Sequence, residues 1–209
     1  MPKGEFAGKA ALVTGASKGI GRAIAAGLAA EGCDVALVAR DEGLLATAAN
    51  EIETAHGVRA IAIPADLSTE DGCAAAADKA QEALGGLDIL VNCAGATRAG
   101  AFAEQPDEDW TDGFALKLFG AVRLTRALWP ALKARKGTVI NVGGDAAYTP
   151  NPAFMIGGAV NAALWHFTKS LSKLGLADDV NVNIVHPGPT ATERRDGLVR
   201  QRAAAEGIT

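Results

Sequence analysis

The order of apolar and polar positions predicts strands that alternate with helices along the chain. Short apolar runs rich in β-branched residues lead into glycine or proline turns, and the segments between them carry apolar residues at helical spacing. This pattern predicts six strands, at Ala10–Thr14, Asp34–Ala39, Val58–Ile63, Asp88–Asn92, Thr138–Val142 and Val180–Val185.

The segments between these strands carry helix signals, with caps, glycine stops and a proline in a first turn. They predict helices from the first glycine turn to Gly32, at Asp41–His56, from Ser68 as N-cap to Gly85, at Pro106–Lys136 and at Ala153–Leu174. Regular alternation of strand and helix is typical of the α/β class, with a doubly wound parallel sheet, helices on both faces and right-handed crossovers.

Composition fits one globular domain spanning residues 1–209. The chain is 49% hydrophobic and 21% charged, enough for a single large core. Its formal net charge of -4 gives no basic surface for nucleic acid or an anionic membrane. No stretch approaches the roughly 18 apolar residues of a membrane span, and the first residues carry no apolar leader core. The sequence predicts a soluble cytoplasmic protein without nucleic-acid or membrane partners.

The three cysteines are Cys33, Cys73 and Cys93, far apart in the chain and without Cys-x-x-Cys or Cys/His metal spacing. Such cysteines are typical of buried thiols in a reducing compartment. No metal site is expected.

A glycine-rich turn follows the first predicted strand. Residues 14–21 read T-G-A-S-K-G-I-G, and apolar residues at i, i+4 spacing come after them. Gly15 and Gly19 allow a tight turn and a close ligand, Gly21 lets the helix lie against the strand, and the free N–H groups of a helix start attract an anion. A plain tight turn is the alternative. In open parallel sheets, ligands bind at the carboxyl ends of the strands, so the loops at 14–21, 92–95, 142–148 and 186–192 should meet there.

With these motifs in view, the chain resembles the short-chain dehydrogenase/reductase family over nearly its whole length. The matching segments are T-G-A-S-K-G-I-G at 14–21, A-D-L at 65–67, N-C-A-G at 92–95, V-I-N-V at 139–142 and P-G-P-T-A-T at 187–192. The resemblance implies a Rossmann-like fold. This chain is expected to lack the C-terminal strand that family members usually have. It also implies a homo-oligomer, a dimer or tetramer, built through the two long helices.

The resemblance also implies a set of cofactor-binding positions around the carboxyl edge of the sheet. For Asn92, a structural hydrogen bond between loops is the alternative to contact with the cofactor. The implied set is Gly15, Ser17, Lys18, Gly19, Ile20, Gly21, Arg40, Asp66, Leu67, Asn92, Ala94, Gly95, Asn161, Pro187, Gly188, Thr190 and Thr192.

Charge at the end of the second strand favours NADP(H) over NAD(H). Proteins that bind NAD place an acid there for the ribose 2′-OH, but this chain has Ala39 followed by Arg40. Together with Ser17 and Lys18, Arg40 offers charge-assisted hydrogen bonds to a 2′-phosphate. Two solvated surface cations are the alternative.

The family's usual catalytic residues are substituted. Gly157 stands at the tyrosine position, Asn161 at the lysine position, Gly144 at the serine position and Lys117 at the asparagine position. The chain's single tyrosine, Tyr148, lies outside the expected helix. The family's usual proton donors are therefore absent from these positions.

Relative to the family pattern, a lysine and an asparagine are exchanged between two helices that the fold should bring alongside each other. Lys117 is a candidate to supply the cation near the ribose, with Asn161 bonding the ribose oxygens, and a solvent-facing Lys117 is the alternative. Tyr148 is a candidate donor or substrate contact, with loop packing as its alternative role. His166 is expected in an interface or the core.

Two functions remain open. The first is an oxidoreductase that moves a hydride between NADP(H) and a small carbonyl or alcohol, with an altered acid/base group. The second is a catalytically silent NADP(H)-binding protein or subunit partner, since fold alone does not imply reaction. The sequence does not identify the substrate.

Overall fold

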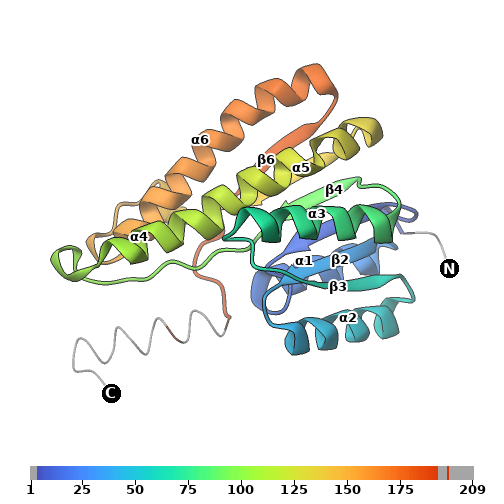
Figure 1. Ribbon diagram of the computed structural model, residues 1–209, viewed down its shortest axis with the longest axis horizontal. Helices are drawn as coiled ribbons and strands as arrows, with labels where there is room; N and C mark the ends of the chain where they lie inside the picture. The colour runs from blue at the N-terminus through green and yellow to red at the C-terminus, as the bar shows by residue number, and fades with distance from the viewer. Residues whose placement is uncertain (1–3, 193–196, 198–209) are drawn as a thin grey trace.

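The fold is a single parallel sheet of six strands in the order β3-β2-β1-β4-β5-β6 (Figure 1). The computed structural model describes residues 4–192 and Gly197. The strands are β1 (Ala10–Thr14), β2 (Asp34–Ala39), β3 (Ala60–Pro64), β4 (Ile89–Asn92), β5 (Thr138–Val142) and β6 (Asn181–Val185). Strand order reverses between β1 and β4, so a ligand is expected at their carboxyl ends.

Helices connect successive strands. They are α1 (Gly19–Ala30), α2 (Glu42–His56), α3 (Glu70–Leu84), α4 (Asp107–Phe114), α5 (Gly120–Arg135) and α6 (Met155–Asp178). Short segments complete the set: the 3-10 helices η1 (Phe102–Glu104), η3 (Asp145–Ala147) and η4 (Pro152–Phe154), and the π-helix η2 (Ala115–Phe119) between α4 and α5.

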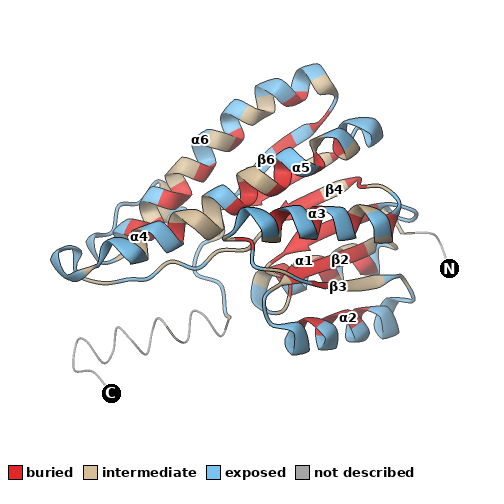
Figure 2. Cartoon of the chain, in the orientation of Figure 1, coloured by how far each residue is buried: buried red, intermediate tan, exposed pale blue. Residues whose placement is uncertain are grey.

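The sheet separates two apolar cores because successive side chains of a strand point to opposite faces. On one face Leu12 and Leu90 pack with apolar residues of α3 and α5. On the other, Val13 and Leu37 pack with residues of α1 and α2. Figure 2 shows the buried residues concentrated in the strands and on the inner faces of the helices. The predicted α/β class with helices on both faces is confirmed.

Several predicted boundaries are wrong. The N-cap of α3 is Thr69, whose hydroxyl accepts from the Gly72 N–H, because Ser68 instead donates to Asp66. The third strand begins at Ala60, since the chain is still turning after Gly57. The long helical region predicted from Pro106 to about Lys136, with Gly113, Gly120 and Pro130 as irregular points, is helical from Asp107 to Arg135 and consists of α4, η2 and α5.

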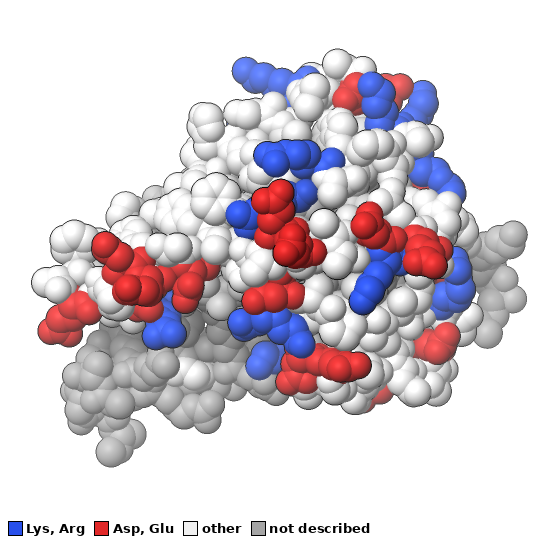
Figure 3. All heavy atoms as spheres, viewed as in Figure 1, with Lys and Arg blue, Asp and Glu red and all other residues white. Residues whose placement is uncertain are grey.

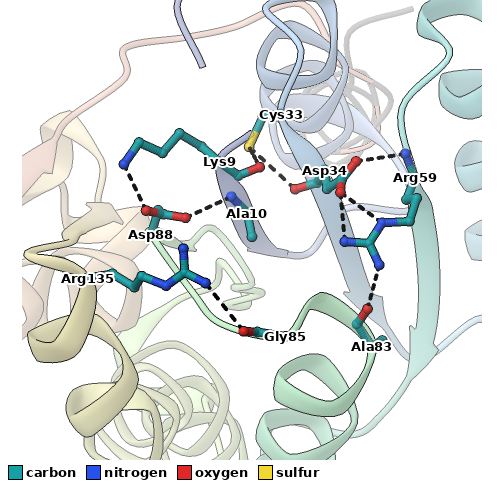
Figure 4. A network of polar contacts seen from close by, with 9 residues as sticks. All are labelled: Lys9, Ala10, Cys33, Asp34, Arg59, Ala83, Gly85, Asp88 and Arg135. Atoms are coloured by element: carbon teal, nitrogen blue, oxygen red, sulfur yellow. Dashed lines mark hydrogen bonds and ion pairs between the residues drawn. The ribbon is translucent and has the colours of Figure 1, made fainter. Parts of the chain in front are cut away.

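The amino edge of the sheet is tied together by a polar network (Figure 4). Asp88 accepts from Lys9 Nζ at 2.9 Å and from the Ala10 N–H at 3.0 Å, which links β1 to the segment before β4. Asp34 pairs with Arg59 at the start of β2 and β3. These contacts hold the strands in register at the edge opposite the ligand side.

Charges of both signs are mixed on the face seen in Figure 3, with acidic side chains gathered over α4. Within the described residues, no helix is both long and apolar enough to cross a membrane. The same part of the chain holds no cluster of His, Cys, Asp and Glu suited to a metal ion.

Candidate functional site

The glycine turn and the start of α1 form one wall of a cleft of about 710 Å³ at the carboxyl edge of the sheet. Gly15 and Gly19 have φ values of +66° and +59°, which favour glycine. A Cβ on Gly21 would lie 2.4 Å from the Gly15 carbonyl oxygen, so only glycine fits at this position. No side chain caps the first turn of α1 and no acid lies in it. This wall suits a phosphate group.

The end of β2 gives the cleft a cationic side. Ser17, Lys18 and Arg40 all line it, beside Ala39. Asp41 is also in the lining, but its carboxylate accepts from the Leu44 N–H as the N-cap of α2. A guanidinium therefore stands where a ribose-binding acid is absent, and the adjacent Asp41 is engaged in capping a helix.

The loop after β4 is held against β1 by Thr14. Its buried hydroxyl accepts from the N–H groups of Cys93 and Ala94, each at 2.9 Å. Burial raises the pKa of the Cys93 thiol to about 11, although the Lys117 charge acts in the opposite direction. Cys93, Ala94 and Gly95 all line the cleft, so this hydrogen-bonded loop forms its floor.

Lys117 projects into the cleft from the π-helix η2 and is not turned to bulk solvent. Its Nζ donates to the carbonyl oxygen of Gly143 at 3.1 Å. Its stem passes over Gly95, where a Cβ would meet Lys117 Cδ at 2.8 Å. A π-helical insertion shifts the helix register locally and is frequent at functional sites. The ammonium therefore lies between the loops after β4 and β5.

Asn161 and Phe154 fill spaces that side chains at two glycines would take. Asn161 is 4% exposed, and its Nδ2 lies 2.8 Å from the position of a Cβ on Gly144. The Phe154 ring lies over Gly157, where a Cβ would be only 2.0 Å from the ring. Larger residues at 144 and 157 would therefore clash with these neighbours. Asn161 Oδ1 is buried without a hydrogen-bond partner among the described residues.

Asn92 belongs to a buried hydrogen-bond chain between the sheet and two helices. Its Nδ2 lies 3.0 Å from Thr125 Oγ1 in α5 and 2.9 Å from Asn141 Oδ1 in β5. Asn141 Nδ2 in turn donates to Thr168 Oγ1 in α6 at 2.8 Å. These hydrogen bonds are those expected for the structural alternative, and a contact between Asn92 and a cofactor stays a prediction.

Tyr148 packs at the end of η3 and is 55% exposed. Its ring makes edge contacts with Trp165, at 5.0 Å between centroids, and with His186, at 4.7 Å. His186 directly follows β6, and no role was predicted for it. Its position at the carboxyl edge, beside loops that already carried candidates, was the available signal.

The predicted site residues divide into two groups. Those that line the cleft are Gly15, Ser17, Lys18, Gly19, Ile20, Gly21, Arg40, Leu67, Ala94, Gly95, Lys117 and Thr192. Those outside its lining are Asp66, Asn92, Tyr148, Asn161, Pro187, Gly188 and Thr190. Asp66 borders the cleft between two lining residues, and hydrogen bonds from Ser68 hold the pKa of its carboxyl below its usual range. Lining residues that the sequence did not single out include Leu44, Leu116, Val142 and Gly143.

A family profile described as short chain dehydrogenase matches residues 9–203. Nodulation protein G of Rhizobium sp. (strain N33) is 40% identical over 195 residues, covering 93% of this chain and 78% of that protein. An oxidoreductase of Bacillus subtilis (strain 168), YvaG, is 34% identical over 205 residues, covering 97% of this chain and 76% of that protein.

Solved structures share the same fold. L-sorbose reductase from Gluconobacter frateurii, complexed with NADPH and L-sorbose, superposes with a TM-score of 0.91 at 35% identity, over 98% of this chain and 78% of that one. A short chain dehydrogenase from Burkholderia cenocepacia J2315 in complex with NADP gives 0.86 at 37% identity, over 90% and 77% of the two chains.

Proposed function

Because the chain belongs to the short-chain dehydrogenase/reductase family, we propose that it is an oxidoreductase acting on a small carbonyl or alcohol with NADP(H). The observation that carries this proposal is the cleft, where a glycine turn suited to phosphate adjoins Ser17, Lys18 and Arg40. A guanidinium and an ammonium match the charge of a 2′-phosphate, and structures with NADP(H) bound occur among the similar proteins.

The residues present fit this cofactor. Backbone N–H groups at the start of α1 would hold its phosphates, Leu67 and Asp66 would border its adenine, and Ala94 and Gly95 would lie beneath it. Bound NADPH supplies the hydride. The protein's own contribution is then to orient the cofactor, to position the substrate carbon and to deliver a proton to the carbonyl oxygen.

Lys117 is the group that we assign to this proton transfer. It reaches the cleft from η2 and donates to the Gly143 carbonyl within hydrogen-bond distance. Its ammonium would stabilise the negative charge that develops on a substrate oxygen and favour ionisation of a nearby water or hydroxyl. Asn161 lies beside the same turn as a candidate ribose contact.

A catalytically silent NADP(H)-binding protein is the second candidate, and one observation favours it. The Phe154 ring lies directly over Gly157, where the family resemblance places the usual tyrosine. An apolar ring there offers no proton and narrows the space for a substrate. Under this alternative the cofactor still binds, and Lys117 serves only to hold the Gly143 turn.

A turnover screen separates the two functions. Purified protein at high concentration is incubated with NADPH and a panel of aldehydes and ketones, and with NADP⁺ and the matching alcohols, while absorbance of the reduced nicotinamide is followed. The oxidoreductase assignment predicts turnover with at least one pair that falls strongly in Lys117→Met. Cofactor binding without turnover by any pair would instead support the silent alternative. Assembly into a dimer or tetramer stays a prediction, which light scattering can test.

A further inference from the structure

The first turn of α6 holds an aromatic ring on the helix face that looks toward the turn after β5. Phe154 comes just before α6, and its ring occupies the space where a Cβ on Gly157 would lie. Asn161 follows Gly157 by four residues, so the two share a helix face, and Asn161 lies beside Gly144 in the turn. The ring is therefore about one helical turn, roughly 5.4 Å along the axis, from the residue that meets the turn.

The loop after β4 meets this part of α6. Its first residues line the cleft, and it then continues to η1. Its Gly100 N–H donates to the Ala153 carbonyl oxygen at 3.1 Å. Closer to the cleft, the side chains of Thr97 and Ile156 both lie over Gly113, where a Cβ would be 3.3 Å and 2.9 Å from their methyl carbons. The loop and the start of α6 therefore form one continuous wall that begins in the cleft.

Apolar side chains at this junction face solvent. Phe102 is 63% exposed and Met155 is 37% exposed, while Phe154 is half-buried. Each is within two residues of the hydrogen-bonded pair Gly100 and Ala153, so the three lie on the same part of the surface and form an apolar rim beside the cleft. Exposed apolar groups that gather next to a cleft are typical of a ligand-binding surface, because a bound apolar group removes them from water.

The charges beside the apolar rim disfavour an anionic occupant. The first turn of α4 contains Asp107, Glu108 and Asp109, and acidic side chains gather over this helix in Figure 3. Asp109 pairs with Arg98 at 3.2 Å, which leaves an excess of negative charge on the turn. A further negative charge would be repelled there, whereas an uncharged aromatic or alkyl group meets no such penalty.

We propose that the substrate is an uncharged carbonyl compound, or the matching alcohol, that carries an aromatic or alkyl group, and that the apolar rim binds this group. This substrate class rests on the proposed oxidoreductase function. The carbonyl faces Lys117, where its carbon takes a hydride and its oxygen a proton while NADPH becomes NADP⁺, and the apolar group lies against the Phe154 ring. A polyol loses hydrogen bonds to water at such a wall, so polar carbonyls are poor substrates.

Alcohols added to the protein with NADPH test the apolar rim without turnover, because a reduced cofactor cannot oxidise them. Dissociation constants of 1-propanol, 1-butanol and 1-hexanol are measured by saturation-transfer NMR, with and without NADPH. We expect the affinity to rise roughly 2- to 4-fold for each added CH₂ that the rim buries.

Variants of the rim decide whether its side chains cause this dependence. Phe102→Ser, at an exposed position that should not affect folding, and Phe154→Ala should each flatten the increase with chain length. Leu176→Ser is the matched control, because Leu176 is 84% exposed near the end of α6. No increase with chain length in the wild type, or the same increase in both rim variants, would overturn the proposal.

Substrate preference is the second readout, and it separates this proposal from the proposed function. Benzaldehyde and hexanal should be reduced with a kcat/KM at least ~10-fold higher than pyruvate or L-sorbose, the ligand in one similar structure, and Phe102→Ser should lower this ratio. Equal or faster turnover of the polar compounds would contradict the apolar rim and leave the oxidoreductase assignment standing. Alcohol binding that depends on the rim, without turnover of any compound, would contradict the oxidoreductase assignment and leave the apolar binding surface standing.

Discussion

The two sides of the cleft are built by different means. On the β1–α1–β2 side, the backbone makes the site. Its glycines have positive φ, the start of α1 has no side-chain cap, and a Cβ added to Gly21 would lie 2.4 Å from the Gly15 oxygen. On the β5–α6 side, next to the cleft lining, side chains fill the space, because Phe154 covers Gly157 and Asn161 lies beside Gly144.

This difference in construction separates the side proposed to bind the cofactor from the side proposed to carry the catalytic groups. A site made of backbone tolerates little change, since a Cβ added at Gly15 or Gly21 would meet main-chain atoms. A site made of side chains can be rebuilt from neighbouring positions while the fold stays the same. A substitution on one side of the cleft should leave the other side unchanged, and the unchanged side then serves as the reference.

The largest effect is expected at the glycine turn. Gly21→Ala places a Cβ 2.4 Å from a backbone oxygen, so the turn must move and cofactor binding should be lost. The overpacking should also cost about 1–3 kcal/mol of unfolding free energy. Calorimetric titration with NADPH and thermal unfolding measure both. Gly27→Ala on α1 is the control, because nothing lies within 4 Å of a Cβ at that position. Normal NADPH binding by Gly21→Ala would contradict the idea that the backbone makes this side of the cleft.

On the opposite side, Lys117→Met should reduce turnover while leaving most of the cofactor affinity. We expect kcat to fall ~100-fold, the scale of a lost acid/base group. Steady-state kinetics and NADPH binding are measured on the same protein. Lys169→Met should behave as wild type. An unchanged kcat would remove Lys117 from the chemistry and return it to a structural role at the Gly143 turn.

Arg40→Gln tests the role of the cationic side of the cleft in cofactor choice. Loss of the guanidinium should weaken NADP(H) binding by roughly 1.5–3 kcal/mol, the range of a charged hydrogen bond, and leave NAD(H) nearly unchanged. Fluorescence titration of the two reduced cofactors measures the difference. Arg126→Gln removes an exposed arginine of α5 and should change neither affinity. An equal loss for both cofactors would mean that Arg40 does not distinguish them.

A tyrosine introduced at position 157, where the family resemblance places one, should destabilise the protein. Gly157→Tyr drives a side chain into the Phe154 ring, so we expect a loss of about 1–3 kcal/mol in unfolding free energy. Gly157→Tyr together with Phe154→Ala should recover much of this loss, because the ring is removed. Chemical denaturation of the single and double variants gives the coupling. A Gly157→Tyr protein as stable as wild type would show that the ring moves aside at little cost.

The smallest effect concerns the thiol in the cleft floor. The pKa of Cys93 is raised to about 11 by burial, so on the order of one thiol in a thousand is ionised at pH 8. Alkylation by iodoacetamide should therefore be slow at pH 8 and accelerate toward pH 11, with bound NADPH slowing it further. Mass spectrometry of the Cys93 peptide follows the reaction. Rapid alkylation at pH 8 would mean that the floor is open to water.

The fold was largely predictable because it rests on local patterns. The apolar runs at Ala10–Thr14 and Asp34–Ala39 became strands with those bounds, since short β-branched runs between turns have few other uses. The π-helix around Lys117 was not predictable, because its residues read as ordinary helix and only the packing between α4 and α5 selects the wider turn.

More of the predicted cofactor-binding positions than of the predicted catalytic positions line the cleft. The spacing of the glycines predicts a phosphate-binding turn directly, and the three glycines of that turn line the cleft. The sequence does not show that Phe154 folds back over Gly157 or that His186 meets the Gly143–Gly144 peptide. Such contacts depend on side-chain rotamers and on loops that come together only in the folded chain.

Calorimetric titration of the unmodified protein with NADPH and with NADH tests the central claim most directly. If backbone donors bind the diphosphate while Lys18 and Arg40 bind the 2′-phosphate, both cofactors bind and NADPH binds at least ~10-fold more tightly. Equal affinities, or tighter binding of NADH, would contradict the assignment of the cationic side, and no binding of either would contradict the cleft as a dinucleotide site.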